Sequence, residues 1–281
     1  MERNDPSALR WLIGVELINY RKESTLTQAE ATRRTGIGKA KLSSMESGRY
    51  QQHPDDVTAL LNAYGVAQRD IDRITSLTGR AESRSWLAPW SHVVPDWFRT
   101  FVGLEGLATA EFAYDPLIIP GLLQTMEYAE ELTRATGFVR PDHSERFVSF
   151  RLARARRLTA DTPLALHAVI GDAALRLTVG DVELRRAQYQ HLVELAKQPN
   201  ITIQVIRPED GPHGAGTGQF VILEFDKARP IAYSELLDGA SYVQDQDQVA
   251  TYRMAADSAR TVALSPEKSM ALLRSMINAS T

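Results

Sequence analysis

Residues 26–49, LTQAEATRRTGIGKAKLSSMESGR, carry the start and stop signals of two short helices in close succession. Thr27 followed by Glu30 is a capping-box pattern, in which the two side chains satisfy free backbone N–H groups of a first helical turn. Gly36 predicts the end of that helix, because glycine adopts the left-handed conformation that a sharp turn requires. A second helix is predicted from about Gly38 to Ser47, with Gly48 as its stop. Two short helices joined in this way are typical of a helix-turn-helix.

The second helix of this pair has one apolar side, formed by Ile37, Leu42 and Met45. Its opposite side is predicted to project from the bundle and to enter a DNA major groove, which is about 12 Å wide. The N-terminus of the first helix suits a phosphate, because its amide groups are free. The candidate DNA-binding residues are Thr27, Gln28, Gly38, Lys39, Ala40, Lys41, Ser43, Ser44, Ser47 and Arg49. The alternative is a helical hairpin that serves only as a protein interaction surface, with both lysines solvated.

The distribution of charge supports a local DNA-binding role. The chain of 281 residues has a formal net charge of −3, which argues against a protein that binds nucleic acid over its whole surface. Residues 1–80 nevertheless hold 12 Lys+Arg against 10 Asp+Glu, and residues 21–49 hold 7 against 3. The positive excess therefore coincides with the predicted helix-turn-helix.

Three further helices, at 7–23 with Ser7 as N-cap, 54–64 and 68–79, complete a predicted all-α domain over residues 1–80. A polar segment with prolines and tryptophans predicts a linker over residues 81–95. Trp86, Trp90 and Trp97 are expected to seal the junction between the domains.

Residues 96–281 are predicted to form a C-terminal regulatory, dimerisation or partner-binding domain. The predicted strands in it are 164–170, 201–206, 219–225 and 231–235, which are rich in β-branched residues. Residues 114–123 are predicted to be extended. The predicted helices are 97–112, 124–136, 144–158, 182–197, 246–263 and 266–278. The fold class expected is multidomain, an N-terminal all-α helix-turn-helix bundle followed by a mixed α/β (α+β) domain.

Several function classes are disfavoured by what the sequence lacks. It has no cysteine, its six histidines are scattered, and no nucleophile elbow is present, so no metal, no cofactor and no enzymatic activity are expected. No run of about 18 apolar residues and no signal peptide are found, so a cytoplasmic protein without a membrane span is expected. An enzyme of an unfamiliar type is the remaining alternative.

Three residues of the C-terminal domain are candidates for a ligand or partner site. Tyr114 and Gln124 flank a proline-bounded turn that forms either a pocket or simply a rigid core strand leading into a helix. His213 lies in a glycine-rich loop, 211–220, that is either a lid or an ordinary connection between strands; the Lys-Ser/Thr pair of a phosphate loop is missing from it. The arginines of residues 145–158 are predicted to be solvated on a one-sided helix, with an acidic partner or a second DNA contact as alternatives.

Residues 26–49 resemble the Xre-type helix-turn-helix of phage repressors, and the agreement is in register at Leu26, Thr27, Gln28, Gly36, Ile37, Glu46, Gly48 and Arg49. The sequence departs from that pattern at Ala31, Thr32, Thr35 and Gly38, so a thin core under the first helix is expected. Residues 94–105, 114–129 and 198–207 resemble the C-terminal domain of an actinobacterial group of Xre regulators described as antitoxin-like.

This resemblance implies a sequence-specific, double-stranded DNA-binding transcriptional regulator. We expect a homodimer, so that two recognition helices meet half-sites about 34 Å apart. The C-terminal domain is expected to sense a ligand or a small protein encoded by the adjacent gene. The alternative function is an antitoxin that neutralises such a small protein, with DNA binding serving autoregulation.

Overall fold

The N-terminal part of the chain is a bundle of helices, and the two helices of the predicted helix-turn-helix lie on either side of Gly36. The computed structural model describes residues 5–79, 85–90, 92–136 and 139–279. The helices of the bundle are α1 (Pro6–Glu23), α2 (Gln28–Thr35), α3 (Lys39–Glu46), α4 (Pro54–Ala63) and α5 (Gln68–Thr78). The predicted N-cap Ser7 is wrong: Asp5 caps α1, because its carboxylate accepts the Ala8 N–H at 2.8 Å.

The C-terminal part is built on one mixed, six-stranded sheet with the strand order β3-β2-β1-β4-β5-β6. β1, β2 and β3 are parallel, whereas β4, β5 and β6 are antiparallel to their neighbours. The strands are β1 (Ala110–Asp115), β2 (Ala165–Gly171), β3 (Ile201–Ile206), β4 (Phe220–Glu224), β5 (Ile231–Leu236) and β6 (Gly239–Val243). The molecule is therefore multidomain and α+β.

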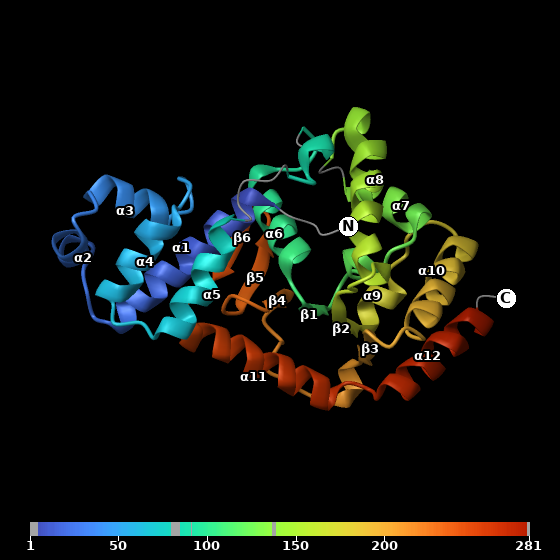
Figure 1. The fold of residues 1–281 in the computed structure, drawn as a ribbon. Coiled ribbons are helices and arrows are strands. Elements are labelled where there is room, and N and C mark those ends of the chain that lie inside the picture. Colours follow the sequence, from blue (N-terminus) through green and yellow to red (C-terminus); the bar gives the residue numbers. More distant parts are fainter. Residues whose placement is uncertain (1–4, 80–84, 91, 137–138, 280–281) are drawn as a thin grey trace.

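Helices cover both faces of this sheet (Figure 1). α7 and α8 lie between the parallel strands β1 and β2 in sequence, and α9 and α10 lie between β2 and β3, as parallel neighbours require. The helices are α6 (Asp96–Leu107), α7 (Met126–Thr136), α8 (Ser144–Ala155), α9 (Asp172–Arg176), α10 (Val182–Leu195), α11 (Gln246–Val262) and α12 (Pro266–Ala279). Short 3₁₀ turns include Ala88–Trp90, Gly121–Leu123 and Arg156–Thr159.

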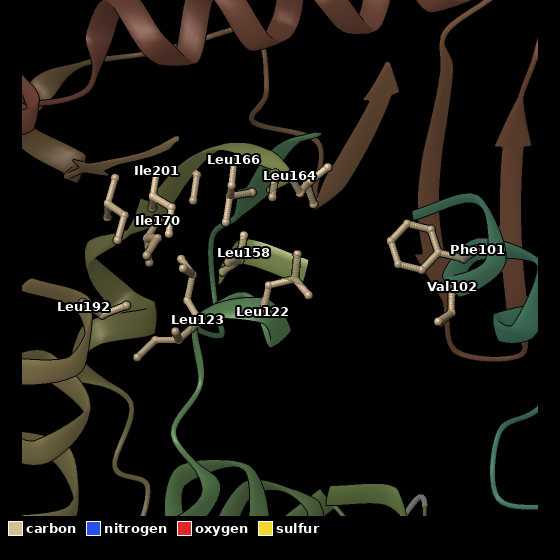
Figure 2. Close-up of a cluster of buried hydrophobic side chains, with 14 of the residues drawn as sticks. Phe101, Val102, Leu122, Leu123, Leu158, Leu164, Leu166, Ile170, Leu192 and Ile201 are labelled. Atoms are coloured by element: carbon tan, nitrogen blue, oxygen red, sulfur yellow. The ribbon is translucent and has the colours of Figure 1, made fainter. Parts of the chain in front are cut away.

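Each sheet face has its own core. The larger core joins the sheet to α6, α7, α8, α10 and α12, and Figure 2 shows Leu122, Leu123, Leu158, Leu166 and Ile201 gathered within it. The smaller core joins the other face to α11. Alternate residues of β1 point to the two faces, so Ala113 belongs to the larger core and Phe112 and Tyr114 to the smaller one.

Three predictions about the C-terminal part were wrong. Residues 110–112 are strand rather than helix, and β6 was missed. The arginines of α8 are not all solvated: Arg154 is 7% exposed and forms a bidentate ion pair with Glu105, at 2.6 and 2.9 Å. The acid that makes this burial possible lies on α6, 49 residues earlier, where a local pattern cannot reveal it.

The bundle and the C-terminal part share a packed junction, and the ring contacts of the predicted Trp86 and Trp90 lie on its C-terminal side. Trp86 and Trp90 pack on Phe150 of α8, inside the C-terminal part. Trp11 of α1 instead contacts Tyr242 of β6, with ring centroids 5.5 Å apart. Of the predicted linker 81–95, residues 81–84 and 91 lie outside the described residues, and residues 88–90 form a 3₁₀ turn.

Candidate DNA interface

α3 presents a polar face to solvent at the end of the molecule that lies away from the sheet (Figure 1). Lys39, Ala40, Ser43 and Ser47 are exposed, and their spacing places them on one side of the helix. Leu42 and Met45 are fully buried against the bundle on the other side. The segment after Gly36 therefore has the exposure that groove contact requires.

A buried carboxylate fixes α3 relative to α1 and α2. Glu46, 5% exposed, accepts two hydrogen bonds from Arg21 of α1, at 2.6 and 2.9 Å. Its Oε2 also accepts the Gln28 side-chain amide from α2 at 2.8 Å, and Arg21 donates in addition to the Leu26 carbonyl at 3.0 Å. One charged group thus connects all three helices, which explains a glutamate at this position of the motif.

Two glycines let α1 and the end of α3 approach closely. A Cβ added to Gly14 would lie 2.4 Å from the Glu46 carbonyl oxygen, so only hydrogen fits there. Gly48 has φ +67°, and a Cβ on it would lie 2.8 Å from the Trp11 Cα. The predicted stop at Gly48 is confirmed, and its cause is both the left-handed conformation and this contact.

The other candidate residues have defined partners. Thr27 and Glu30 form the predicted capping box, and the hydrogen bonds from Thr27 lower the pKa of the Glu30 carboxyl. Gln28 is half-buried because it binds Glu46. Lys41 lies on the flank of α3 and pairs with Asp56 of α4 at 2.7 Å. Ser47 donates to the Ser44 carbonyl at 3.2 Å.

Additional exposed groups lie close to the predicted residues in sequence. Gly38 and Arg49, at either end of α3, are exposed. Arg33 and Arg34 at the C-terminal end of α2 are exposed as well, and Tyr50 is 53% exposed directly after α3. Sequence reasoning did not select Arg33, Arg34 or Tyr50 individually, although the positive count over residues 21–49 includes Arg33 and Arg34.

The structure does not bring the three C-terminal candidates into one site. The Tyr114 hydroxyl lies 3.4 Å from His213 Nε2, on the α11 face of the sheet. Gln124 lies on the other face, where its amide donates to the Ile119 carbonyl and its Oε1 accepts from Arg151. The loop with His213 is held against α11, since the Gly214 N–H donates to Ser258 Oγ at 2.9 Å. The predicted pocket formed by Tyr114 and Gln124 together is therefore wrong, because the two side chains lie on opposite faces of the sheet.

Comparison with known families agrees with this division of the chain. A model described as a helix-turn-helix domain matches residues 12–74, which span α2 and α3. A model described as "Domain of unknown function (DUF5753)" matches residues 98–275, well over half of the chain. The chain belongs to the DUF5753 family. Searches of curated proteins and of solved structures gave no match.

In this DUF5753 protein the helix-turn-helix domain thus precedes the family domain along the chain. Within the described ranges, no three His, Asp or Glu side chains are grouped closely enough to hold a metal ion. None of the helices that the structure describes combines the length and apolar character needed to cross a membrane. The helix-turn-helix indicates a DNA-binding regulator.

Proposed function

We propose that this protein is a sequence-specific transcriptional regulator of the Xre type that reads double-stranded DNA with α3. The observation that carries the proposal is the exposed polar face of α3, which is rigidly backed by Glu46 and Arg21. Lys39 and Ser43 point away from the bundle core, where they can reach base edges. Lys41 and Arg49 flank them, in positions suited to phosphates.

We further propose that the protein acts as a homodimer, without catalysis, and that its C-terminal domain senses a ligand or partner. Two copies of α3 about one helical turn apart would read two half-sites. The junction supports the sensing role, because Arg229 of the C-terminal domain contacts three side chains of α1: Glu16, Tyr20 and Glu23. A shift in the C-terminal domain would therefore move the reading helix.

The antitoxin alternative, suggested by the resemblance to the actinobacterial antitoxin-like group, is favoured by one feature. Leu117, Leu236 and Leu237 are 66%, 54% and 92% exposed and lie at the same end of the sheet. Exposed leucines of this kind suit a protein partner. If the protein is an antitoxin, the product of the adjacent gene will co-purify with it, and Leu237→Asp will abolish the complex.

The main proposal is tested by binding to the DNA upstream of the protein's own gene across a salt series. We expect specific binding that weakens steeply with salt, because phosphate contacts release counterions. Changing both Lys39 and Lys41 to Ala should lower affinity at least about tenfold and reduce the slope of log K against log salt by about 1 to 2.

The matched control changes Lys197 and Lys268 to Ala. Both lysines are exposed, Lys197 just after α10 and Lys268 on α12, so the control removes the same charge far from α3 in sequence. This double variant should bind like the unmodified protein. Equal affinity for the upstream DNA and for scrambled DNA, or no effect of the Lys39 and Lys41 changes, would refute the proposal.

A further inference from the structure

We propose that the cavity between the sheet and helices α6, α7 and α8 binds an organic amine carried on an apolar body. The inference rests on the proposed sensing role of the C-terminal domain, and it names the chemistry that would be sensed. It concerns a cavity that none of the DNA-binding residues touch.

The cavity has the size and walls of a small-molecule site. Its volume is about 720 Å³, within the range of roughly 300 to 1,000 Å³ that ligand pockets occupy. Its walls include aromatic rings from α6, α8 and β5, namely Phe98, Phe101, Phe147 and Tyr233. These rings give the apolar body of a ligand its contact surface, while the guanidinium groups of Arg151 and Arg154 already lie over Phe147, Phe98 and Phe101.

Three buried polar groups along this cavity have no hydrogen-bond partner among the described residues. They are Glu111 Oε2, Thr133 Oγ1 and the Tyr233 hydroxyl, and their residues are only 6%, 3% and 3% exposed. Leaving such a group buried and unpaired is unfavourable, because the group has lost its hydrogen bonds to water. Their concentration in one cavity is explained by a ligand that supplies the missing partners.

The floor of the cavity carries two carboxylates on one strand. Glu111, Ala113 and Asp115 alternate along β1 and therefore share the face toward the cavity. Strand geometry places the Cα atoms of Glu111 and Asp115 about 13 Å apart. Ala113 between them contributes only a methyl group, so the floor accommodates an elongated molecule.

The charge balance selects a cation. Glu235 of β5 adds a third carboxylate to the lining. Of the two α8 arginines that line the cavity, Arg154 is neutralised by Glu105, whereas Arg151 donates to the uncharged Gln124 at 2.7 Å and keeps its positive charge. Arg140, which also lines the cavity, is paired with Asp142 at 3.1 Å. With its three carboxylates ionised against the charge of Arg151, the lining is net negative, and a cationic ligand would neutralise it.

Two of these acids hold a proton more readily than free carboxyls, and a bound cation would favour their ionised forms. Burial, with a contribution from Glu235, raises the pKa of Asp115 to about 7, and burial raises the pKa of Glu111 well above its usual range. His92 and His143 line the same cavity. Since the described His, Asp and Glu residues form no metal-binding group, the cation expected is organic.

Calorimetric titration with three indole probes tests the proposal. Tryptamine, indole-3-propionamide and indole-3-propionate share a ring and a two-carbon stem but differ in charge. We expect tryptamine to bind at least about tenfold tighter than the amide, and the propionate to bind more weakly still. At least one of Asp115→Asn and Glu111→Gln should lower the affinity for tryptamine about tenfold relative to the amide.

The matched control is Asp161→Asn, which removes an exposed acid outside the cavity and should leave the amine-to-amide ratio unchanged. At pH 6 the ammonium group should displace the proton of Asp115, so tryptamine binding should release protons, measured in buffers of different ionisation enthalpy. Phenethylamine and 4-phenylbutylamine extend the series of probes, because they carry the same ammonium group on a phenyl ring with stems of two and four carbons.

The proposal fails if the amide binds as tightly as tryptamine, or if no amine of the series binds below about 1 mM. It also fails if neither variant changes the ratio, or if no proton is released. These measurements contain no DNA, so they can fail while salt-dependent DNA binding holds, and the reverse can also occur.

Discussion

Glu111 and Asp115 occupy positions of a central strand packed under helices, where side chains are ordinarily apolar. Their burial keeps protons on them at pH values where free carboxyls are ionised, as the raised pKa values express. Acids at these positions weaken the fold unless something offsets their burial. A proton or a bound cation can do so, which connects stability to ligand binding.

We predict that Asp115→Asn stabilises the protein more at pH 8 than at pH 4.5. The pKa of Asp115 is about 7 in the folded protein and about 3.9 in the unfolded chain, so the folded state holds the extra proton between these values. Stability therefore falls as pH rises from about 4 to 7, and the full loss persists above pH 7. Asparagine removes this loss. Urea unfolding at both pH values measures it, with Asp161→Asn as a control that should show no such difference.

At the scale of elements, the position of α3 depends on backbone proximity as much as on side chains. The C-terminal end of α3 lies so close to α1 that Gly14 has no room for a Cβ. α2 contributes little to holding it, since Ala31 is the only residue of α2 that is buried. The expected thin core under α2 is confirmed, and the Glu46 ion pair with Arg21 offsets it.

We predict that Gly14→Ala destabilises the helical bundle by about 1 to 3 kcal/mol, the usual cost of overpacking. The intrinsic preference of helices for Ala over Gly, about 1 kcal/mol, would suggest the opposite. The steric contact with the Glu46 carbonyl decides the sign. Thermal unfolding measures the effect, and DNA affinity should fall with it because α3 is displaced.

Gly79→Ala is the comparison, because Gly79 ends α5 with φ −66° and no atom of the described residues lies within 4 Å of its added Cβ. This change should leave stability within about 0.5 kcal/mol of the original. An unaltered Gly14→Ala protein would show that α1 and α3 are not in close contact.

For the whole molecule, the junction between bundle and C-terminal domain is polar as well as apolar. The Arg229 N–H donates to Glu16 Oε1 at 2.6 Å, and its guanidinium lies 4.3 Å from the centre of the Tyr20 ring. Asn19 donates to the Gln244 carbonyl at 3.2 Å, and Arg73 donates to the Lys227 carbonyl at 2.7 Å. Tyr242, which contacts Trp11, also packs against Tyr233 of the cavity wall, with ring centroids 5.2 Å apart. A continuous aromatic contact thus connects the cavity to α1.

We predict that Arg229→Met uncouples the two parts of the molecule. Glu16 is fully buried, and among the described residues the loss of Arg229 leaves only Arg73, at 3.6 Å, to balance its charge. Removing one partner of a buried ion pair typically costs about 3 to 5 kcal/mol. Differential scanning calorimetry should show one transition for the original protein and a separate, earlier transition of the bundle for the variant.

Arg253→Met provides the control, because Arg253 pairs with Glu224 within the C-terminal domain and is half exposed. The Arg253→Met protein should unfold in a single calorimetric transition, like the original protein. If Arg229→Met also unfolds in one step at an unchanged temperature, the junction does not couple the two parts.

The sequence by itself determined the helix-turn-helix and much of the C-terminal sheet. The capping box of Thr27 and the turn at Gly36 act within a few residues, so a local pattern contains all the information they need. The β-branched run of residues 201–206 predicted β3 correctly for the same reason.

Only the tertiary structure decided β1, the buried arginines and the domain junction. The acids on β1 obscured its strand pattern, because Glu111 and Asp115 are polar residues on a buried face. Arg154 is buried because Glu105 lies opposite it, and Arg229 meets Glu16 across 213 residues of chain. A charge can be buried only where its partner is, and the position of a distant partner is set by the fold rather than by neighbouring residues.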